Sequence, residues 1–146
     1  NFADSTSNEC FVTGYQFEVG SVATPFEHRS YGDELARCQR YYCLIASAAG
    51  IIGTGGAYNT GNVWAVVPLP VDMRAAPSLD QTSGTNYYAV TGEKGAAQFN
   101  SLTLEGNTTS RMARISAQSG ITVTQGSAYF IEINDTPAFV AFSSEL

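Results

Sequence analysis

Charged residues are scarce in this sequence, and their scarcity excludes several kinds of partner. Only 14% of the 146 residues are charged, and the formal net charge is −6. A polyanion such as nucleic acid is repelled by this balance, so we expect no nucleic-acid partner. No apolar run approaches the roughly 20 residues that span a bilayer, so we expect no membrane insertion. Uncharged polar residues then cover much of the surface, either on an ordinary monomer or beside another subunit.

Residues that carry catalytic chemistry are equally scarce. The single histidine, His28, lies between Glu27 and Arg29, and we expect an exposed polar residue there rather than a metal ligand. The sequence has no Gly-x-Ser-x-Gly nucleophile motif and no calcium-loop pattern, and its scattered carboxylates form no recognisable glycosidase pair. We therefore expect no catalytic residue, no metal site, no cofactor and no enzyme activity.

Cysteine occurs in an odd number, at Cys10, Cys38 and Cys43, without a Cys-x-x-Cys pair. Cys38 and Cys43 lie around the end of a predicted helix and would face different ways, which argues against a disulfide between them. The pattern favours buried free thiols in a protein that folds in a reducing cytosol.

The first 43 residues change their local pattern twice. Residues 11–19 alternate apolar and polar side chains, which predicts a half-buried strand. Residues 20–29 break this strand, because Pro25 favours an extended backbone, and they predict a connecting arm. Ser30 followed by Asp33 predicts a helix N-cap. The helix over residues 30–43 then has one apolar face, made of Leu35, Cys38, Tyr41 and Tyr42.

Strand-sized apolar segments separated by polar turns fill the rest of the chain. They cover residues 44–48, 63–69, 78–81, 87–91, 98–105, 111–117, 128–134 and 138–142. This spacing predicts an all-β fold, an antiparallel sandwich of jelly-roll type. Residues 63–69 are apolar almost throughout, so we expect both faces of that strand to be covered, the second by the helix or by a neighbouring subunit. The turn at residues 133–137 predicts a hairpin that pairs the last two strands.

Two segments have more than one interpretation. Residues 53–62 are rich in glycine and predict a long polar loop or an interface, with sugar contact as the alternative. The strand at residues 11–19 has no nearby partner, and an isolated strand is unstable. It adds to the edge of the following sandwich, closes an upstream module, or pairs with another subunit. We divide the chain into a closing strand with its arm (1–29), a helix (30–43) and a head domain (44–146), and expect a piece of a longer polypeptide.

Three stretches of the sequence resemble proteins of tailed phages. They are QFEVGSVATPFEHRSYGDELARCQRYY (16–42), PLPVDMRAAPSL (68–79) and AFVAFSSEL (138–146). The first resembles the junction in tail-fibre and other virion structural proteins, where the closing strand of one β-sandwich leads into a C-terminal head domain. The resemblance implies a virion location after folding in the bacterial host cytoplasm, and commonly a trimeric fibre end that meets the host surface. It supplies no catalytic motif.

The expected function is therefore binding. Sugars are recognised by an aromatic face together with planar polar groups, and several such residues lie near the predicted loops. The expected ligand-binding residues are Tyr58, Trp64, Asp80, Asn86 and Tyr87, although each aromatic also suits the core or a trimer interface. The expected subunit interface is the helix face with Leu35, Cys38, Tyr41 and Tyr42. The sequence thus predicts a homotrimeric fibre or spike head that binds host-surface carbohydrate; the alternative is a capsid-decorating or fibre-anchoring module that binds another virion protein.

Overall fold

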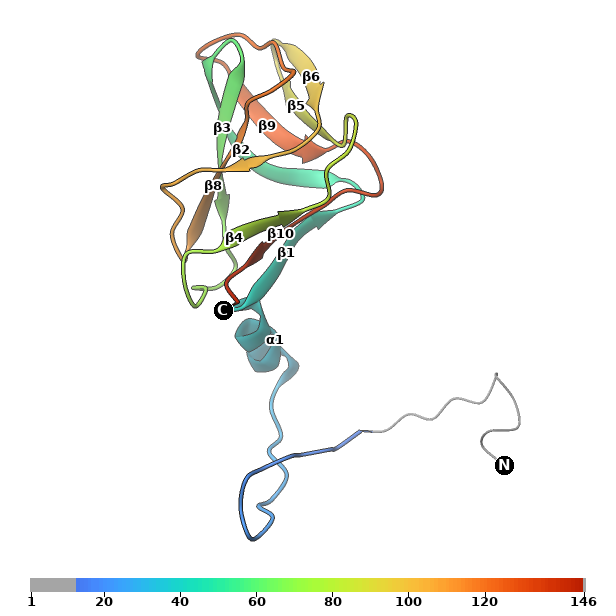
Figure 1. Ribbon diagram of the computed structural model, residues 1–146, viewed down its shortest axis with the longest axis vertical. Coiled ribbons are helices and arrows are strands. Elements are labelled where there is room, and N and C mark those ends of the chain that lie inside the picture. Colours follow the sequence, from blue (N-terminus) through green and yellow to red (C-terminus); the bar gives the residue numbers. More distant parts are fainter. Residues whose placement is uncertain (1–12, 146) are drawn as a thin grey trace, which may run out of the picture.

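Two antiparallel β-sheets form the body of the protein, and one short helix precedes them (Figure 1). The computed structural model describes residues 13–145. The smaller sheet has the order β1 (Tyr42–Ser47), β10 (Phe139–Ser143), β4 (Ser78–Gln81). The larger sheet has the order β6 (Gly95–Phe99), β5 (Tyr88–Gly92), β9 (Ala128–Ile133), β2 (Gly50–Asn59), β3 (Asn62–Pro68), β8 (Met112–Ala117), β7 (Thr103–Leu104). The predicted all-β antiparallel sandwich is confirmed, and its strands divide unevenly, three and seven.

The core lies between the two sheets and follows from alternation along each strand. In β9 the side chains of Tyr129, Ile131 and Ile133 are buried, as the alternation predicts. They belong to one apolar cluster that also includes Val140 and Phe142 of the smaller sheet. Because this cluster draws on both sheets, burial of its apolar surface holds them together.

A buried tyrosine also connects the sheets. Tyr88 of β5 is fully buried, and its hydroxyl donates to the backbone oxygens of Thr82 (2.6 Å) and Phe139 (3.1 Å). Phe139 begins β10 and Thr82 follows β4, so one side chain of the larger sheet is fixed to the smaller one. Burial raises the pKa of the Tyr88 hydroxyl to about 12 because it disfavours the phenolate.

Helix α1 (Tyr31–Gln39) begins as the sequence predicts and ends earlier. The Ser30 hydroxyl accepts from the backbone N–H of Asp33 (3.1 Å) and donates to Oδ2 of Asp33 (2.7 Å), which confirms the cap. The helix ends at Gln39 because Arg40 caps it and Tyr42 already belongs to β1. No residue of α1 is buried, and the helix lies beside the body rather than against a sheet (Figure 1).

The predicted N-terminal strand is not formed where the structure describes it. Residues 13–19 have no regular secondary structure, and residues 11 and 12 lie outside the described range. Local hydrogen bonds replace a strand partner: Glu18 accepts from the N–H and hydroxyl of Thr24, and Oε1 of Gln16 accepts from the N–H of Glu27 (2.8 Å). This N-terminal segment (residues 13–29) extends away from the body (Figure 1).

The predicted glycine-rich loop is wrong, because most of residues 53–62 belong to β2 and its turn into β3. Glycine is needed there for close packing. A Cβ added at Gly55 would overlap the backbone oxygen of Trp64, and one at Gly53 would lie 3.0 Å from the oxygen of Val66. These glycines allow β3 to pack closely against a central strand, which composition alone does not reveal.

One further prediction about the strands is wrong, and another is only partly tested. The turn after Ile133 does not pair the last two strands, because β9 belongs to the larger sheet and β10 to the smaller one. Asp135 shapes this turn by accepting from the N–H of Ala138 (3.1 Å), and the chain changes sheet there. Strand β3 is covered on one face within the single chain: Val63 is fully buried, whereas Val66 is 45% exposed. The helix does not supply the second cover, and cover by a neighbouring subunit stays a prediction.

The cysteine prediction is partly wrong as well. Cys43 is a buried free thiol, as expected, and burial raises its pKa. Cys38 is an exposed free thiol, because no other element packs on its side of α1. Cys10 lies outside the described residues.

Candidate functional site

An aromatic stack stands on the outer face of the larger sheet. The rings of Tyr58 and Trp64 are stacked, with centroids 4.3 Å apart and an interplanar angle of 13°. The guanidinium carbon of Arg114 lies 3.8 Å from the centroid of the Trp64 ring. We call these three residues the aromatic stack. Strand positions explain it, because β2, β3 and β8 are neighbours and each contributes one member.

The strand register places the two neighbours of Trp64 on different sides of it. Arg114 pairs with Val66, two residues beyond Trp64 along β3. Tyr58 precedes Asn59, which pairs with Asn62, two residues before Trp64. The indole is therefore enclosed from both directions along the strand, and the Tyr58 side chain, 60% exposed, is the open end of the aromatic stack.

Two buried polar atoms beside the aromatic stack lack hydrogen bonds. Within residues 13–145, Nε1 of Trp64 and Oδ1 of Asn62 are buried without a partner. Both residues lie on the outer face of β3, two positions apart. Buried donors and acceptors without partners are rare in folded proteins, and each calls for a complementary group such as a hydroxyl or water. One donor and one acceptor beside an aromatic surface suit a ligand that carries hydroxyls.

A polar network adjoins the aromatic stack where β3 meets β8, away from β2. Ser116 pairs with Trp64 across the strands and is fully buried. Its hydroxyl donates to Oε1 of Glu105 (2.6 Å), and the same oxygen accepts from Nε2 of Gln118 (2.6 Å). The network fixes a carboxylate and an amide next to the aromatic surface, which is the polar complement that sugar hydroxyls require.

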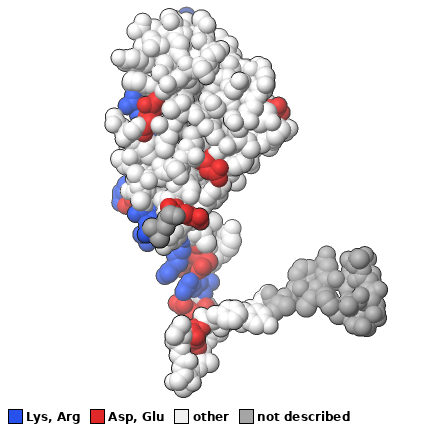
Figure 2. Space-filling view, viewed as in Figure 1, with Lys and Arg blue, Asp and Glu red and all other residues white. Residues whose placement is uncertain are grey.

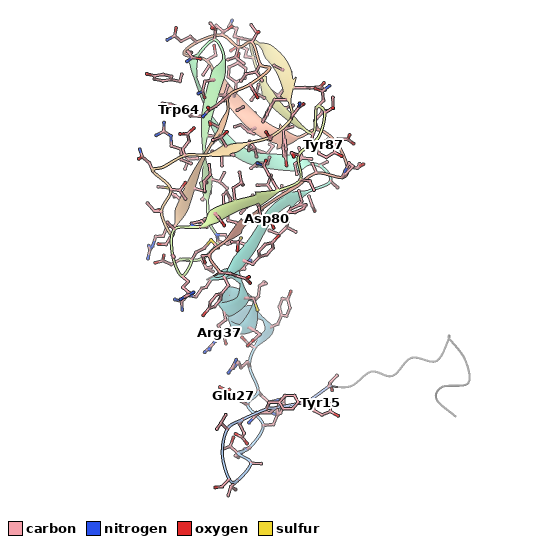
Figure 3. All side chains as sticks on the ribbon, viewed as in Figure 1. Tyr15, Glu27, Arg37, Trp64, Asp80 and Tyr87 are labelled. Atoms are coloured by element: carbon pink, nitrogen blue, oxygen red, sulfur yellow. The ribbon has the colours of Figure 1, made fainter. Side chains whose placement is uncertain are left out.

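The structure brings together only part of the predicted ligand-binding set. Tyr58 and Trp64 are in contact, whereas Asp80 lies on β4 of the smaller sheet, and Asn86 and Tyr87 precede β5. Figure 3 shows Trp64, Asp80 and Tyr87 on separate parts of the body. These residues share only their closeness in sequence to predicted loops, and the sheets separate them in space.

Asp80, Asn86 and Tyr87 have local contacts instead. Oδ2 of Asp80 accepts from the hydroxyl of Tyr42 (3.0 Å), and burial together with this carboxylate raises the pKa of Tyr42. Asn86 has a positive φ of 60°, and its backbone oxygen accepts from Nδ2 of Asn134 (2.8 Å). Tyr87 is half-buried, and its N–H donates to the backbone oxygen of Gly84 (3.3 Å). Such contacts indicate roles in fixing loops and strand positions.

Sequence reasoning missed Asn62, Glu105, Arg114, Ser116 and Gln118. Nothing in the linear sequence joins them to Trp64, because they come from different strands or strand ends. Pairing of β3 with β8, and of β7 with β8, brings them together. A register prediction is the signal that could have identified them.

The predicted subunit-interface residues are all exposed. Leu35 is 41%, Tyr41 47% and Tyr42 41% exposed, and Cys38 is also exposed. Charge gathers in the same region: Figure 2 shows acidic and basic side chains over α1 and the N-terminal segment, and few on the visible face of the body. The helix region and the aromatic stack are thus distinct surfaces of different character.

The part of the chain that the structure describes has neither a cluster of metal-binding side chains nor a helix suited to span a membrane. Residues 13–145 contain no group of three or more His, Cys, Asp or Glu side chains arranged to hold a metal ion. No helix in that range has the length and hydropathy to cross a bilayer. Comparison of the chain with family models, curated proteins and solved structures found no match.

Proposed function

We propose that this chain is the head domain of a phage fibre or spike, a non-catalytic virion protein that binds host-surface carbohydrate as a homotrimer. The resemblance of residues 16–42 to virion junctions supports the virion location. The free thiols Cys38 and Cys43 suit folding in a reducing bacterial cytoplasm. The observation that carries the carbohydrate proposal is the unpaired Nε1 of Trp64 and Oδ1 of Asn62 beside the aromatic stack.

Recognition of a sugar at this position uses both kinds of group. The C–H face of a sugar ring packs on an aromatic ring, and its hydroxyls bond to planar polar groups around the ring edge. Tyr58 offers the exposed ring, and rotation of its side chain would give a hydroxyl access to Trp64 Nε1. Glu105 supplies an acceptor nearby, and Ser116 and Gln118 fix its position by donating to its carboxylate.

A glycan array tests this proposal. The unmodified protein should show saturable binding to a subset of sugars, and Trp64→Ala and Asn62→Ala should each weaken it by about tenfold, since each removes a group specific to the site. Tyr15→Ala is the matched control, because Tyr15 is 73% exposed in the N-terminal segment and belongs neither to the aromatic stack nor to the helix face of the proposed trimer. Circular dichroism verifies folding of each variant. Equal binding by all four proteins contradicts the assigned site.

The homotrimer is supported by apolar side chains on and beside α1 that stay partly exposed in a single chain. Leu35 and Tyr42 are 41% exposed, and Leu44 is 55% exposed on the neighbouring β1. Three copies around an axis would bury these side chains and join three weak sugar sites into one multivalent surface. Light scattering at micromolar concentration should give a trimer, and Leu35→Asp should dissociate it. A monomer in the unmodified protein contradicts this assembly.

A second function, as a capsid-decorating or fibre-anchoring module, is favoured by the N-terminal segment. Phe17 and Val19 are 93% and 108% exposed there, while Gln16 and Glu18 fix the segment through hydrogen bonds to Thr24 and Glu27. An ordered segment with exposed apolar side chains suits another virion protein as partner. Saturable binding to purified capsid or tail particles, without glycan binding, supports this function over the first.

A further inference from the structure

A second aromatic surface lies on the other side of β2 from the aromatic stack. Phe130 of β9 is 46% exposed, and its outward direction follows from the burial of Tyr129 and Ile131 on either side. It borders a cavity of about 340 Å³, lined mainly by Thr54, Gly55, Glu93, Lys94, Ala128 and Phe130. Phe130 gives the cavity an aromatic wall, and Glu93 and Lys94 give it charged groups, so it can hold a ring and bond the edge of that ring.

The strand register connects this cavity to the aromatic stack. Gly56 of β2 pairs with Trp64 on one side and with Ala128 on the other. Thr54 pairs with Val66 and with Phe130 in the same way. Two rows of paired residues therefore cross the sheet from β9 to β3. One row consists of Ala128, Gly56 and Trp64, and the other consists of Phe130, Thr54 and Val66. Adjacent strands lie about 4.8 Å apart, so two strand spacings, about 10 Å, separate the Phe130 wall from the β3 wall.

The middle of these rows carries no large side chain. Gly56 has no side chain, and a Cβ added there would meet only the backbone oxygen of Ser127, at 3.5 Å. Thr54 is exposed and small. We call the surface over Thr54 and Gly56, between Phe130 and Trp64, the trough; the cavity at Phe130 forms one end of it. Its floor is backbone and threonine. Phe130 stands on one side of it, and Trp64 with the 45% exposed Val66 stands on the other.

We infer that the trough binds a linear neutral oligosaccharide that crosses β9, β2 and β3, with one sugar unit at Phe130 and another at the aromatic stack. This inference rests on the proposed carbohydrate function and names its ligand class. A single sugar ring does not reach both walls, whereas consecutive units of one chain do. Glu93 and Lys94 form a loose pair (3.8 Å), so the rim offers an acceptor and a donor without net charge.

The chemistry of the trough excludes other occupants. An added peptide strand needs a free sheet edge, and the edges of this sheet are β6 and β7, whereas the trough crosses its central strands. A purely apolar ligand leaves Thr54 and the rim charges without hydrogen bonds. A flexible chain of hydroxyl-bearing rings satisfies both the aromatic walls and the polar floor.

A length-graded glycan array tests the inference. It carries oligomers of one to six units of glucose, galactose, N-acetylglucosamine and rhamnose, each measured with the unmodified protein. For the sugar that binds, affinity should rise with length until both walls are occupied. Phe130→Ala should remove about three- to tenfold of the affinity for longer oligomers and leave binding of the single sugar unchanged. Gly56→Ala should act in the same direction by raising the floor.

One control variant separates the outcomes. Met112→Ala is the matched variant, because Met112 is 51% exposed on the outer face of the same sheet but lies outside the trough, opposite Pro68. It should bind every oligomer normally. If affinity is independent of length, or if Phe130→Ala binds long oligomers as the unmodified protein does, the trough inference fails and the single-site function stands. If the unmodified protein binds no glycan, both fail together.

Discussion

Replacement of Arg114 by alanine tests whether the aromatic stack is an energetic unit. The guanidinium lies 3.8 Å from the Trp64 ring and is half-buried, so its attraction to the ring is only partly screened by water. A cation over an aromatic ring contributes about 0.5–1 kcal/mol when exposed and about 2 kcal/mol when desolvated. The Arg114 stem also covers apolar surface of the sheet. We expect Arg114→Ala to lower the free energy of unfolding by about 1–2 kcal/mol.

The sequence provides its own reporter for this measurement. Trp64 is the single tryptophan, so fluorescence excited selectively at tryptophan comes from the aromatic stack alone. Loss of Arg114 admits water to one side of the indole, and emission should move to longer wavelength. A loss of about 1–2 kcal/mol corresponds to a fall in Tm of roughly 2–8 °C for a domain of this size. The Tm of Arg114→Lys should lie between that of the unmodified protein and that of Arg114→Ala, because lysine keeps the charge and loses the planar contact.

Arg111→Ala is the control for a general charge effect. Arg111 directly precedes β8, the strand that carries Arg114. Its Nε lies 3.1 Å from Oδ2 of Asp72, and both side chains are exposed. Exposed ion pairs of this kind contribute little, so Tm and emission should stay unchanged. If Arg114→Ala matches the unmodified protein in both measurements, Arg114 does not stabilise the indole and our account of the aromatic stack is refuted.

Three further predictions concern the core. Burial raises the pKa of Tyr88 to about 12 from its ordinary value of 10.0. The stability that the neutral hydroxyl provides is therefore present below pH 10 and is lost as the pH rises through about 12. Alkaline unfolding should show this loss, and Tyr88→Phe should abolish it. Buried Cys43 should resist alkylation in the native protein while exposed Cys38 reacts, as peptide mass mapping can test; equal modification contradicts the packing around β1. Gly55→Ala should prevent folding because its Cβ overlaps the Trp64 carbonyl, whereas Gly56→Ala should fold normally, and circular dichroism distinguishes them.

Local patterns predicted the fold well where a segment decides its own structure. Alternation in residues 128–134 gave the buried side of β9, and Ser30 with Asp33 gave the start of α1. The errors lie where distant neighbours decide. Gly53 and Gly55 look like loop residues, yet the close approach of β3 makes them a central strand. Residues 13–19 look like a strand, yet hydrogen bonds within the N-terminal segment replace the missing partner.

The same distinction explains how much of the candidate site the sequence revealed. Tyr58 and Trp64 were identified because aromatic residues near a glycine-rich segment are visible in one dimension. Arg114 and Phe130 were not, because each reaches the site through a register that β2 and β3 set. A single glycine decides the shape between them: Gly56 separates the two aromatic walls without filling the space. The feature that suggested a loop in the sequence is therefore the one that opens the trough in the sheet.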